Sequence, residues 1–549
     1  MAPITDDDWA DLVAHELPKT DDPVVQKYLE SRRALMAEEG KHRSADHAFR
    51  QALSPIAKQA CAILSRIRHE ERLAGASTNT VNTKETAKSW HIIYRLPKGT
   101  LLRAHCHALV DLDFLIETAL ATPGMHLCSP ANQLVTAEER REAKLRIRFR
   151  SKANFHASSP WTPDYKPGAF VPLTAAADAF PEGGREGFIA WLGGRCSMDA
   201  LKLVSELVDG MIYYEPIWRA FLQCLMANLA DEGVRWLELR LSSRLVYYRE
   251  GSETPDPDHD HVCHAIDEEA AKFKATNRGE VFWGLRIIWP SICGGQDPRS
   301  IIEDADDCIA TKLAWPHLVA GYDIRSSESP SGTLATRLPE LFWFRKQCAL
   351  EGITIPFFFH AADCPGGDGL ADDDNLFDAL LLGARRIANA PSLPQHPRLI
   401  EAIKDKRILV EGTSCVTPGG NACSPLPELL ARGVSCVLSD DKFGILSVGA
   451  SSRMTDVFWH AFQTWSTADL ATLGSMAENS VRWAAFEDQD AETWVRDIRA
   501  ASMGGGVKAA RLQQWAVEWE RFCLWVVTEH GDTYGDGMDG EPEPLATAG

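Results

Sequence analysis

Residues 101–110, LLRAHCHALV, form the first of eight short β-rich segments whose recurrence along the chain decides the fold. Helix-length stretches separate these segments, and this alternation implies parallel strands joined by right-handed crossovers. Eight such units predict an α/β fold of the closed (β/α)8 type, a TIM barrel with its site at the carboxyl ends of the strands. The strands are expected over residues 101–110, 234–243, 282–291, 318–325, 354–362, 385–389, 407–413 and 435–441. A doubly wound open sheet is the alternative, although no G-x-G-x-x-G motif follows the first segment.

Composition limits the partners of the chain. It has 549 residues, of which 57 are Lys or Arg and 77 are Asp or Glu, so its formal net charge is −20. This charge argues against nucleic acid and anionic membranes as partners, because both are bound by clustered basic side chains. It is compatible with a small-molecule substrate held in a single pocket. No apolar run approaches the ~20 residues needed to span a membrane.

Cysteine usage and the first residues favour a cytoplasmic location. The 14 cysteines are scattered, and no two lie at C-x-x-C spacing. Scattered cysteines of this kind can serve as small buried apolar residues inside a reducing cell. The chain begins MAPITDDDWADL, which is acidic where a secretory signal would be basic and then apolar.

Residues 1–90 predict a helical N-terminal extension, because they have helical periodicity and no strand-like run. One amphipathic helix is expected to open at Pro23, and another is expected over residues 48–71. The Ser54-Pro55 pair can interrupt the second helix and start a new one, with Ser as cap and Pro in the first turn. The extension is a candidate dimerisation element, which makes a homodimer one expectation.

The rest of the chain is expected to form the barrel, a pair of insertions within it, and a C-terminal region of helices and a tail. The barrel is assigned to residues 91–490, with insertions near 151–190 and 250–262 that are rich in turn-forming residues and predict loops. C-terminal helices are expected over residues 491–528. Residues 529–549 are acidic, rich in Gly and Pro and without Lys or Arg, which predicts a disordered tail.

Polar side chains gather at the expected carboxyl ends of the strands. Arg103, His105 and His107 share one face of the first strand, because alternate residues of a strand point the same way. The later strand ends contribute His360, Asp363, Asn389, Asp440 and Asp441. Neutral imidazole and carboxylate are good ligands for zinc, which lowers the pKa of bound water to about 7. Buried polar residues satisfied by hydrogen bonds are the alternative, and their recurrence at three strand ends favours a site.

A series of motifs resembles one family. The segment LPKGTLLRAH at 96–105 resembles the M-P-K-G-x-L-L-H-x-H start of the adenosine deaminase growth-factor family. This family is a branch of the adenosine and AMP deaminase superfamily of metal-dependent hydrolases. Further motifs follow in the family order: WLELR at 236–240, GYD at 321–323, FHAAD at 359–363, RIANA at 386–390, SDD at 439–441 and NS at 479–480. The match spans roughly residues 90–485, and its order and spacing imply the family and its barrel fold.

The resemblance implies a hydrolase acting on a C–N bond, which converts adenosine or a related purine nucleoside to inosine and ammonia. In the family the first strand supplies two His ligands to one zinc ion, the fifth strand one His, and the eighth an Asp. The matching residues here are Arg103, His105, His360 and Asp440, so a permanent cation replaces one ligand. The implied metal ligands are therefore His105, His360 and Asp440, since three protein ligands plus water can suffice for a catalytic zinc.

The residues implied to carry the chemistry also depart from the family pattern. Asp363 matches a family Glu that donates a proton to the purine, and its side chain is one methylene shorter. Asn389 matches a family His that orients or deprotonates the attacking water, and an amide cannot take that proton. The implied catalytic residues are Asp363, Asp440 and Asn389, and the implied substrate-binding residues are Arg103, His107 and Asp441.

These departures leave two interpretations open. In the first, the remaining ligands hold a metal, Asp363 acts as the acid, and a deaminase or related hydrolase survives with altered specificity or efficiency. In the second, the barrel is catalytically degenerate or repurposed and binds a small ligand, such as an anion, without deaminating it. Arg103 would be the anchor in that case, because its planar guanidinium suits carboxylate and phosphate groups.

Overall fold

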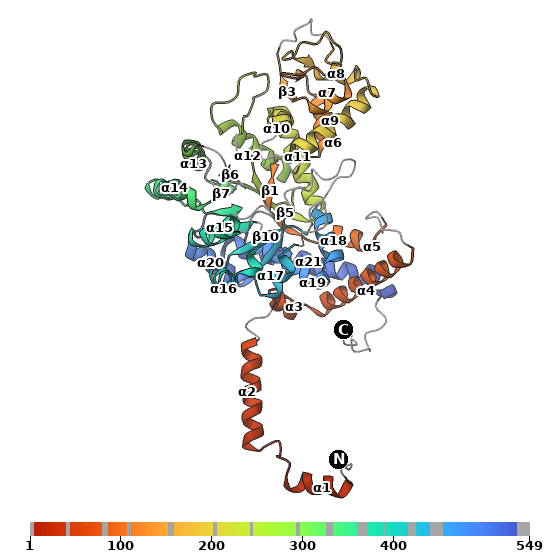
Figure 1. Cartoon of the computed structure of the whole chain (residues 1–549), viewed down its shortest axis with the longest axis vertical. Coiled ribbons are helices and arrows are strands. Elements are labelled where there is room, and N and C mark those ends of the chain that lie inside the picture. The colour runs from red at the N-terminus through yellow and green to blue at the C-terminus, as the bar shows by residue number, and fades with distance from the viewer. Residues whose placement is uncertain are drawn as a thin grey trace.

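The structure is a computed structural model, and it describes most of the chain. The described residues are 5–39, 44–78, 86–106, 109, 111–151, 159–200, 206–241, 245–292, 297–325, 333–360, 370–388, 390–414, 424–439 and 454–534. They form a central barrel with helices at both ends of the chain and a long insertion after the first barrel strand (Figure 1). No helix among them combines the length and the apolarity needed to cross a membrane.

Eight parallel strands form the central sheet and follow one another in chain order. They are β1 (Gly99–His105), β5 (Val234–Arg240), β6 (Gly284–Ile292), β7 (Val319–Arg325), β8 (Phe358–His360), β9 (Arg386–Ala388), β10 (Leu409–Gly412) and β11 (Cys436–Leu438). Each strand overlaps one of the eight segments expected from the sequence. The order has no reversal of the kind that defines a doubly wound sheet, so the predicted (β/α)8 barrel is confirmed.

The first and last strands of the barrel meet at a seam. Ser439 directly follows β11, and its hydroxyl accepts a hydrogen bond from the Arg103 backbone N–H (2.9 Å) and donates one to the Arg103 carbonyl (3.2 Å). Helix α19 (Leu470–Arg482) lies against both strands. From it, Ser480 accepts from the Thr100 N–H (2.8 Å) and Asn479 donates to the Cys436 carbonyl (3.1 Å). These contacts close the sheet into a barrel.

Helices cover the outside of the barrel, one before each barrel strand from β5 onward and one after β11. They are α11 (Glu215–Asp231), α12 (Asp260–Lys274), α13 (Pro298–Ala314), α14 (Leu338–Leu350), α15 (Leu370–Leu381), α16 (Pro397–Lys406), α17 (Leu426–Ala431) and α18 (Met454–Thr464). Helix α16 illustrates the pattern: proline occupies its first turn, and its buried residues Leu399, Ile400 and Ile403 share one face. Burying one apolar stripe of each helix against the strands is what holds such a layer in place.

The long insertion lies between β1 and β5. Its strands β2 (Met125–Cys128), β3 (Arg146–Phe149) and β4 (Val171–Pro172) form an antiparallel sheet in the order β3-β2-β4. Its helices are α6 (Leu112–Ala121), α7 (Ala137–Glu142), α8 (Leu173–Asp178), α9 (Gly184–Ala200) and α10 (Glu206–Ile212). The prediction of a loop near 151–190 is therefore wrong for its second half. An aromatic cluster explains the order there, because the buried Trp161 ring packs edge-on against Phe180 and Trp191.

The second expected loop is shorter than predicted. Helix α12 begins at Asp260, so the last residues of the segment 250–262 are helical, while the described residues before them form turns. The side chain of Trp315 donates a hydrogen bond to Asp260 (2.8 Å), which ties the start of α12 to the turn that follows α13.

The described residues of the N-terminal region form helices joined by turns, with no strand among them. It holds α1 (Asp6–His15), α2 (Pro23–Glu39), α3 (His47–Ala52), α4 (Pro55–Thr78) and α5 (Lys88–Tyr94). The expected break at Ser54-Pro55 is confirmed, because α3 ends before it and the Ser54 hydroxyl accepts from the Ala57 N–H (3.0 Å) to cap α4. Arg50 of α3 makes a forked ion pair with Asp469 (2.6 and 2.7 Å), which anchors α3 to the start of α19.

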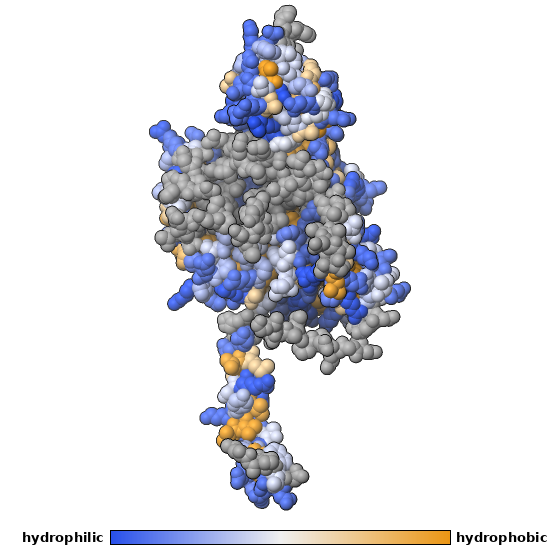
Figure 2. Space-filling model, turned by 45° about the vertical axis from the view of Figure 1, so that its right-hand side comes forward, coloured by the Kyte–Doolittle hydropathy of each residue, from blue (hydrophilic) through white to orange (hydrophobic). Residues whose placement is uncertain are grey.

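Helices α1 and α2 extend away from the barrel (Figure 1). Helix α2 buries none of its residues. Its apolar side chains Val24, Tyr28, Leu35 and Met36 are all exposed, and Figure 2 shows apolar surface along this helix.

The C-terminal region ends in two helices, α20 (Ala491–Ala500) and α21 (Gly506–Tyr534). Helix α21 packs along α4 and buries Trp515, Trp519 and Phe522. It continues six residues further than the helical region expected from the sequence, so residues 529–534 are helical and the prediction of disorder is wrong for them. Residues 535–549 lie outside the described residues.

Candidate active site

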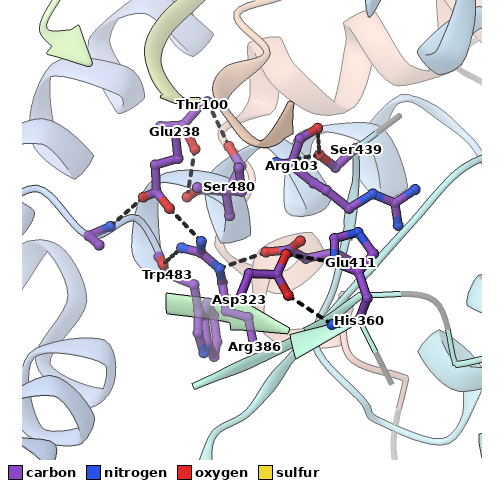
Figure 3. Close-up of polar contacts among 12 residues, drawn as sticks. Thr100, Arg103, Glu238, Asp323, His360, Arg386, Glu411, Ser439, Ser480 and Trp483 are labelled. Atoms are coloured by element: carbon purple, nitrogen blue, oxygen red, sulfur yellow. Dashed lines mark hydrogen bonds and ion pairs between the residues drawn. The ribbon is translucent and has the colours of Figure 1, made fainter. Parts of the chain in front are cut away.

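The candidate site lies inside the barrel, where the carboxyl ends of β1, β5, β7 and β8 meet (Figure 3). The side chains that face one another there are those of Arg103, His105, Arg240, Asp323 and His360. All five are buried, and the least buried of them is His105 with 7% of its surface exposed. Parallel strands deliver these residues to one end because their carboxyl ends share one edge of the sheet.

Asp323 is the centre of the hydrogen-bond network. Its Oδ2 atom accepts from Arg240 Nε (2.7 Å) and pairs with His360 Nδ1 (2.6 Å). Its Oδ1 atom accepts from the His360 backbone N–H (3.1 Å). Arg240 also donates to the Leu102 carbonyl of β1 (2.9 Å), so the network ties four strands together, β1, β5, β7 and β8.

This network sets both the charge of Asp323 and the tautomer of His360. Burial opposes the charge of the carboxylate, but the facing His360 and Arg240 groups outweigh it and hold the pKa of Asp323 well below its ordinary value. An ionised Asp323 can only accept hydrogen bonds, so the proton in the short contact belongs to His360 Nδ1. With Nδ1 protonated, the neutral ring carries its lone pair on Nε2, and this tautomer is the one that binds a metal through Nε2.

The two histidines predicted as metal ligands lie side by side. The ring centroids of His105 on β1 and His360 on β8 are 5.3 Å apart, with an angle of 51° between the ring planes. Residues 255 positions apart in the chain are thus neighbours in the barrel, as the prediction of a common site requires.

Arg103 is held in the same layer as the histidines. It precedes His105 by two residues on β1, only 1% of its surface is exposed, and its backbone is fixed by Ser439 at the seam. A guanidinium keeps its charge at any physiological pH, so this position contributes a permanent cation and no metal ligand.

The remaining predicted site residues lie outside the described residues. They are His107, Asp363, Asn389, Asp440 and Asp441. Within the described residues no group of three or more His, Cys, Asp or Glu side chains could hold a metal. The third predicted ligand, Asp440, lies outside them.

A second polar layer lies deeper in the barrel. Arg386 of β9 pairs with Glu238 of β5 and with Glu411 of β10 (2.6 Å to the latter), and all three are fully buried. Arg386 also donates to the Trp483 carbonyl (2.9 Å), and Glu238 accepts from the Ala485 N–H (2.6 Å). This layer fixes the strands below the site to the segment that follows α19.

Sequence reasoning missed the roles of Arg240, Asp323 and the deeper layer. Their motifs, WLELR and GYD, mark them only as inward-facing charged residues of buried strands. Their position on the inward face of buried strands could have identified these residues as partners of one another. A charge inside a barrel requires an opposite charge beside it.

The chain is similar in sequence to adenosine deaminases. No family model matches the chain. Adenosine deaminase 2 from Sus scrofa is 24% identical over 466 residues, which cover 80% of this chain and 81% of that protein. Adenosine deaminase 2 from Homo sapiens is 23% identical and covers 81% of this chain and 82% of its own length. The chain is a homologue of adenosine deaminase 2.

The resemblance to the growth-factor branch is therefore confirmed. An adenosine deaminase from Lutzomyia longipalpis is also similar, with 22% identity over 80% of each chain. Among solved structures, a zinc-bound amidohydrolase from Burkholderia ambifaria has 16% identity and a TM-score of 0.49, covering 82% of this chain and 97% of its own. An Arabidopsis N6-mAMP deaminase has 14% identity and a TM-score of 0.46, covering 75% of this chain and 100% of its own.

Proposed function

We propose that this protein is a metal-dependent hydrolase that deaminates adenosine, or a related purine nucleoside, to inosine and ammonia. The observation that carries the proposal is the buried His105–His360 pair at the carboxyl end of the barrel, with Asp323 fixing the tautomer of His360. The adenosine deaminases among its relatives support the substrate class, since they match the chain over about 80% of its length.

The residues present fit one divalent metal, for which we propose zinc. His105, His360 and Asp440 would hold it, two imidazoles and one carboxylate of the kind found in catalytic zinc sites. When bound, the metal lowers the pKa of a water molecule to about 7 and so supplies a nucleophile at neutral pH. Arg103 stands in the sequence where the family has a fourth ligand, and a guanidinium cannot bind a metal, so we propose three protein ligands.

The remaining residues are proposed to act on the substrate. Asp363 follows β8 and is the proposed proton donor to the purine ring. Asn389 follows β9 and can orient the attacking water by a hydrogen bond without accepting its proton. Asp441 is proposed to accept a hydrogen bond from the purine, and His107 to contact the ribose. A shorter acid and a missing base predict slower turnover than in a deaminase with the family residues.

Two measurements on the full-length protein test this proposal. The first is the zinc content after incubation with zinc and removal of the excess, for which we expect about one equivalent. The second is inosine release from adenosine, with Asp440→Ala as the control. The proposal fails if the wild type binds no zinc, or if wild type and Asp440→Ala release inosine equally slowly. Binding of adenosine without inosine release would instead favour the repurposed barrel.

We further propose that the protein acts in the cytoplasm as a homodimer. The apolar side chains along α2 support a dimer, because exposed apolar surface of this extent on one helix favours association. Single buried thiols such as Cys106, Cys308 and Cys436 support the cytoplasm, where cysteines stay reduced. Sedimentation velocity and fractionation of the source cells test the two statements separately.

A further inference from the structure

A cavity of about 760 Å³ opens at the amino-terminal end of the barrel. Its lining includes Ile408, directly before β10, and Ser435, directly before β11. The candidate active site lies at the opposite, carboxyl-terminal end of the barrel. Helices α3, α16, α19 and α20 supply the rest of the wall. The volume lies in the range of small-molecule sites, which is about 300–1,000 Å³.

The lining of this cavity is basic although the chain as a whole is strongly acidic. It contains the basic side chains of Lys404, Arg407, Arg482 and Arg499 and the acidic side chains of Asp405 and Glu478. Two of the cations are already paired, Arg482 with Glu478 (2.5 Å) and Lys404 with Glu401 (3.4 Å). Arg407 and Arg499 make no ion pair with any described residue. Two exposed arginines of the lining are therefore not held by an ion pair with a described residue.

Arg407 occupies a backbone conformation that normally belongs to glycine. It ends α16 with φ 56° and ψ 46°, the left-handed region. Glycine is the usual residue at such a helix end, because a Cβ atom disfavours the left-handed conformation. The Trp483 indole N–H donates to the Arg407 carbonyl (2.8 Å), and the Arg407 N–H donates to the Lys404 carbonyl (3.2 Å), so this backbone is held in place. A strained residue whose side chain lines a cavity is a candidate for a ligand contact.

The walls add neutral donors and an apolar side. Ser435 and Ser475 are among the lining residues, as are the apolar Phe49 and Ile408. Hydroxyl donors and forked guanidinium groups together match the several oxygens of a phosphate.

We propose that this cavity is a second ligand site, which binds a small phosphate-bearing molecule through Arg407 and Arg499. The guanidinium groups pair with the phosphate oxygens, and the apolar side of the cavity accommodates the body of the ligand. The site is separate from the deamination chemistry, so the proposal does not rest on the proposed function.

Isothermal titration calorimetry of the full-length protein with inorganic pyrophosphate at constant ionic strength tests the proposal. We expect saturable binding to the wild type and about tenfold weaker binding to Arg407→Gly, the usual effect of losing one charged hydrogen bond. Glycine keeps the left-handed backbone and removes only the cation, so this variant is expected to fold normally. Arg499→Gln is expected to weaken binding to a similar degree.

Arg398→Gln is the matched control. Arg398 lies on the same helix as Lys404, is exposed, and is not part of the cavity lining. Unchanged pyrophosphate binding in this variant supports a defined site. The proposal is overturned if the wild type shows no saturable binding, or if Arg398→Gln weakens binding as much as Arg407→Gly, because the attraction would then be that of surface charge alone.

Discussion

Replacing Asp323 by Asn removes one charge and one acceptor from the centre of the candidate site, and we expect it to weaken metal binding. The two oxygens of Asp323 accept from Arg240 Nε, His360 Nδ1 and the His360 backbone N–H. An asparagine has one acceptor oxygen, so at least one of these donors loses its partner in either orientation of the amide. If the amide nitrogen faces the ring, the imidazole proton moves to Nε2, and His360 can no longer bind a metal.

The structure sets the size of both expected effects. Loss of a carboxylate that orients a metal-binding histidine reduces metal affinity by about 10–100-fold. Arg240 is fully buried, and Asp323 is the one carboxylate that pairs with it among the described residues. Removing this partner leaves a buried charge uncompensated, which costs about 3–5 kcal/mol of folding free energy.

A paired measurement separates the two effects. Glu238→Gln also neutralises a buried carboxylate that pairs with an arginine inside the barrel, but among the described residues Glu238 has no hydrogen bond or ion pair with a histidine. Urea unfolding is expected to show both variants destabilised, while zinc titration with a competing chelator is expected to show weaker binding only for Asp323→Asn. Equal zinc affinities in Asp323→Asn and the wild type would refute the role assigned to this carboxylate.

Three further predictions concern the ligand set, the acid and a buried lysine. The triple variant Arg103→His, Asn389→His and Asp363→Glu is expected to release inosine faster, by about 100-fold from the restored reach of the acid alone, and no gain would mean that the pocket has diverged further. Asp440→Ala is expected to lose stoichiometric zinc in elemental analysis, and retained zinc would exclude it as a ligand. Burial lowers the pKa of Lys508 to about 7, so between pH 7 and its unfolded pKa of about 10.4 the unfolded chain binds more protons. The stability of the wild type relative to Lys508→Met should therefore rise with pH across this range in urea unfolding, and a constant difference would contradict the lowered pKa.

The barrel could be predicted from the sequence because each strand is a short apolar run with turn residues on both sides. The ends of the strands were less predictable, because the pattern of side chains does not show where backbone hydrogen bonding begins. The fifth expected strand, 354–362, illustrates this. Pro356 has no N–H to donate, and its carbonyl accepts from Tyr322, so the regular strand β8 begins only at Phe358.

The candidate site was predictable in part for a similar reason. Alternation along β1 and the end of β8 placed His105 and His360 at the same end of the barrel, and the structure brings them together. The Arg240–Asp323–His360 network was not predictable, because it joins residues of three strands and depends on the register between them. The ordered half of the segment 151–190 was missed because its many Pro, Ser and Gly residues obscure the aromatic cluster around Trp161.

The bond between Ser439 and Arg103 has a consequence for how the site is acquired. It joins residues 336 positions apart, at the two strands that supply His105 and lead on to Asp440. Closure of so long a loop is entropically costly and late in folding. A chain released before residue 439 would therefore contain both histidines without the complete ligand set. Zinc retention would thus report whether the last strand has docked, and it could serve as a folding assay for this barrel independent of any substrate.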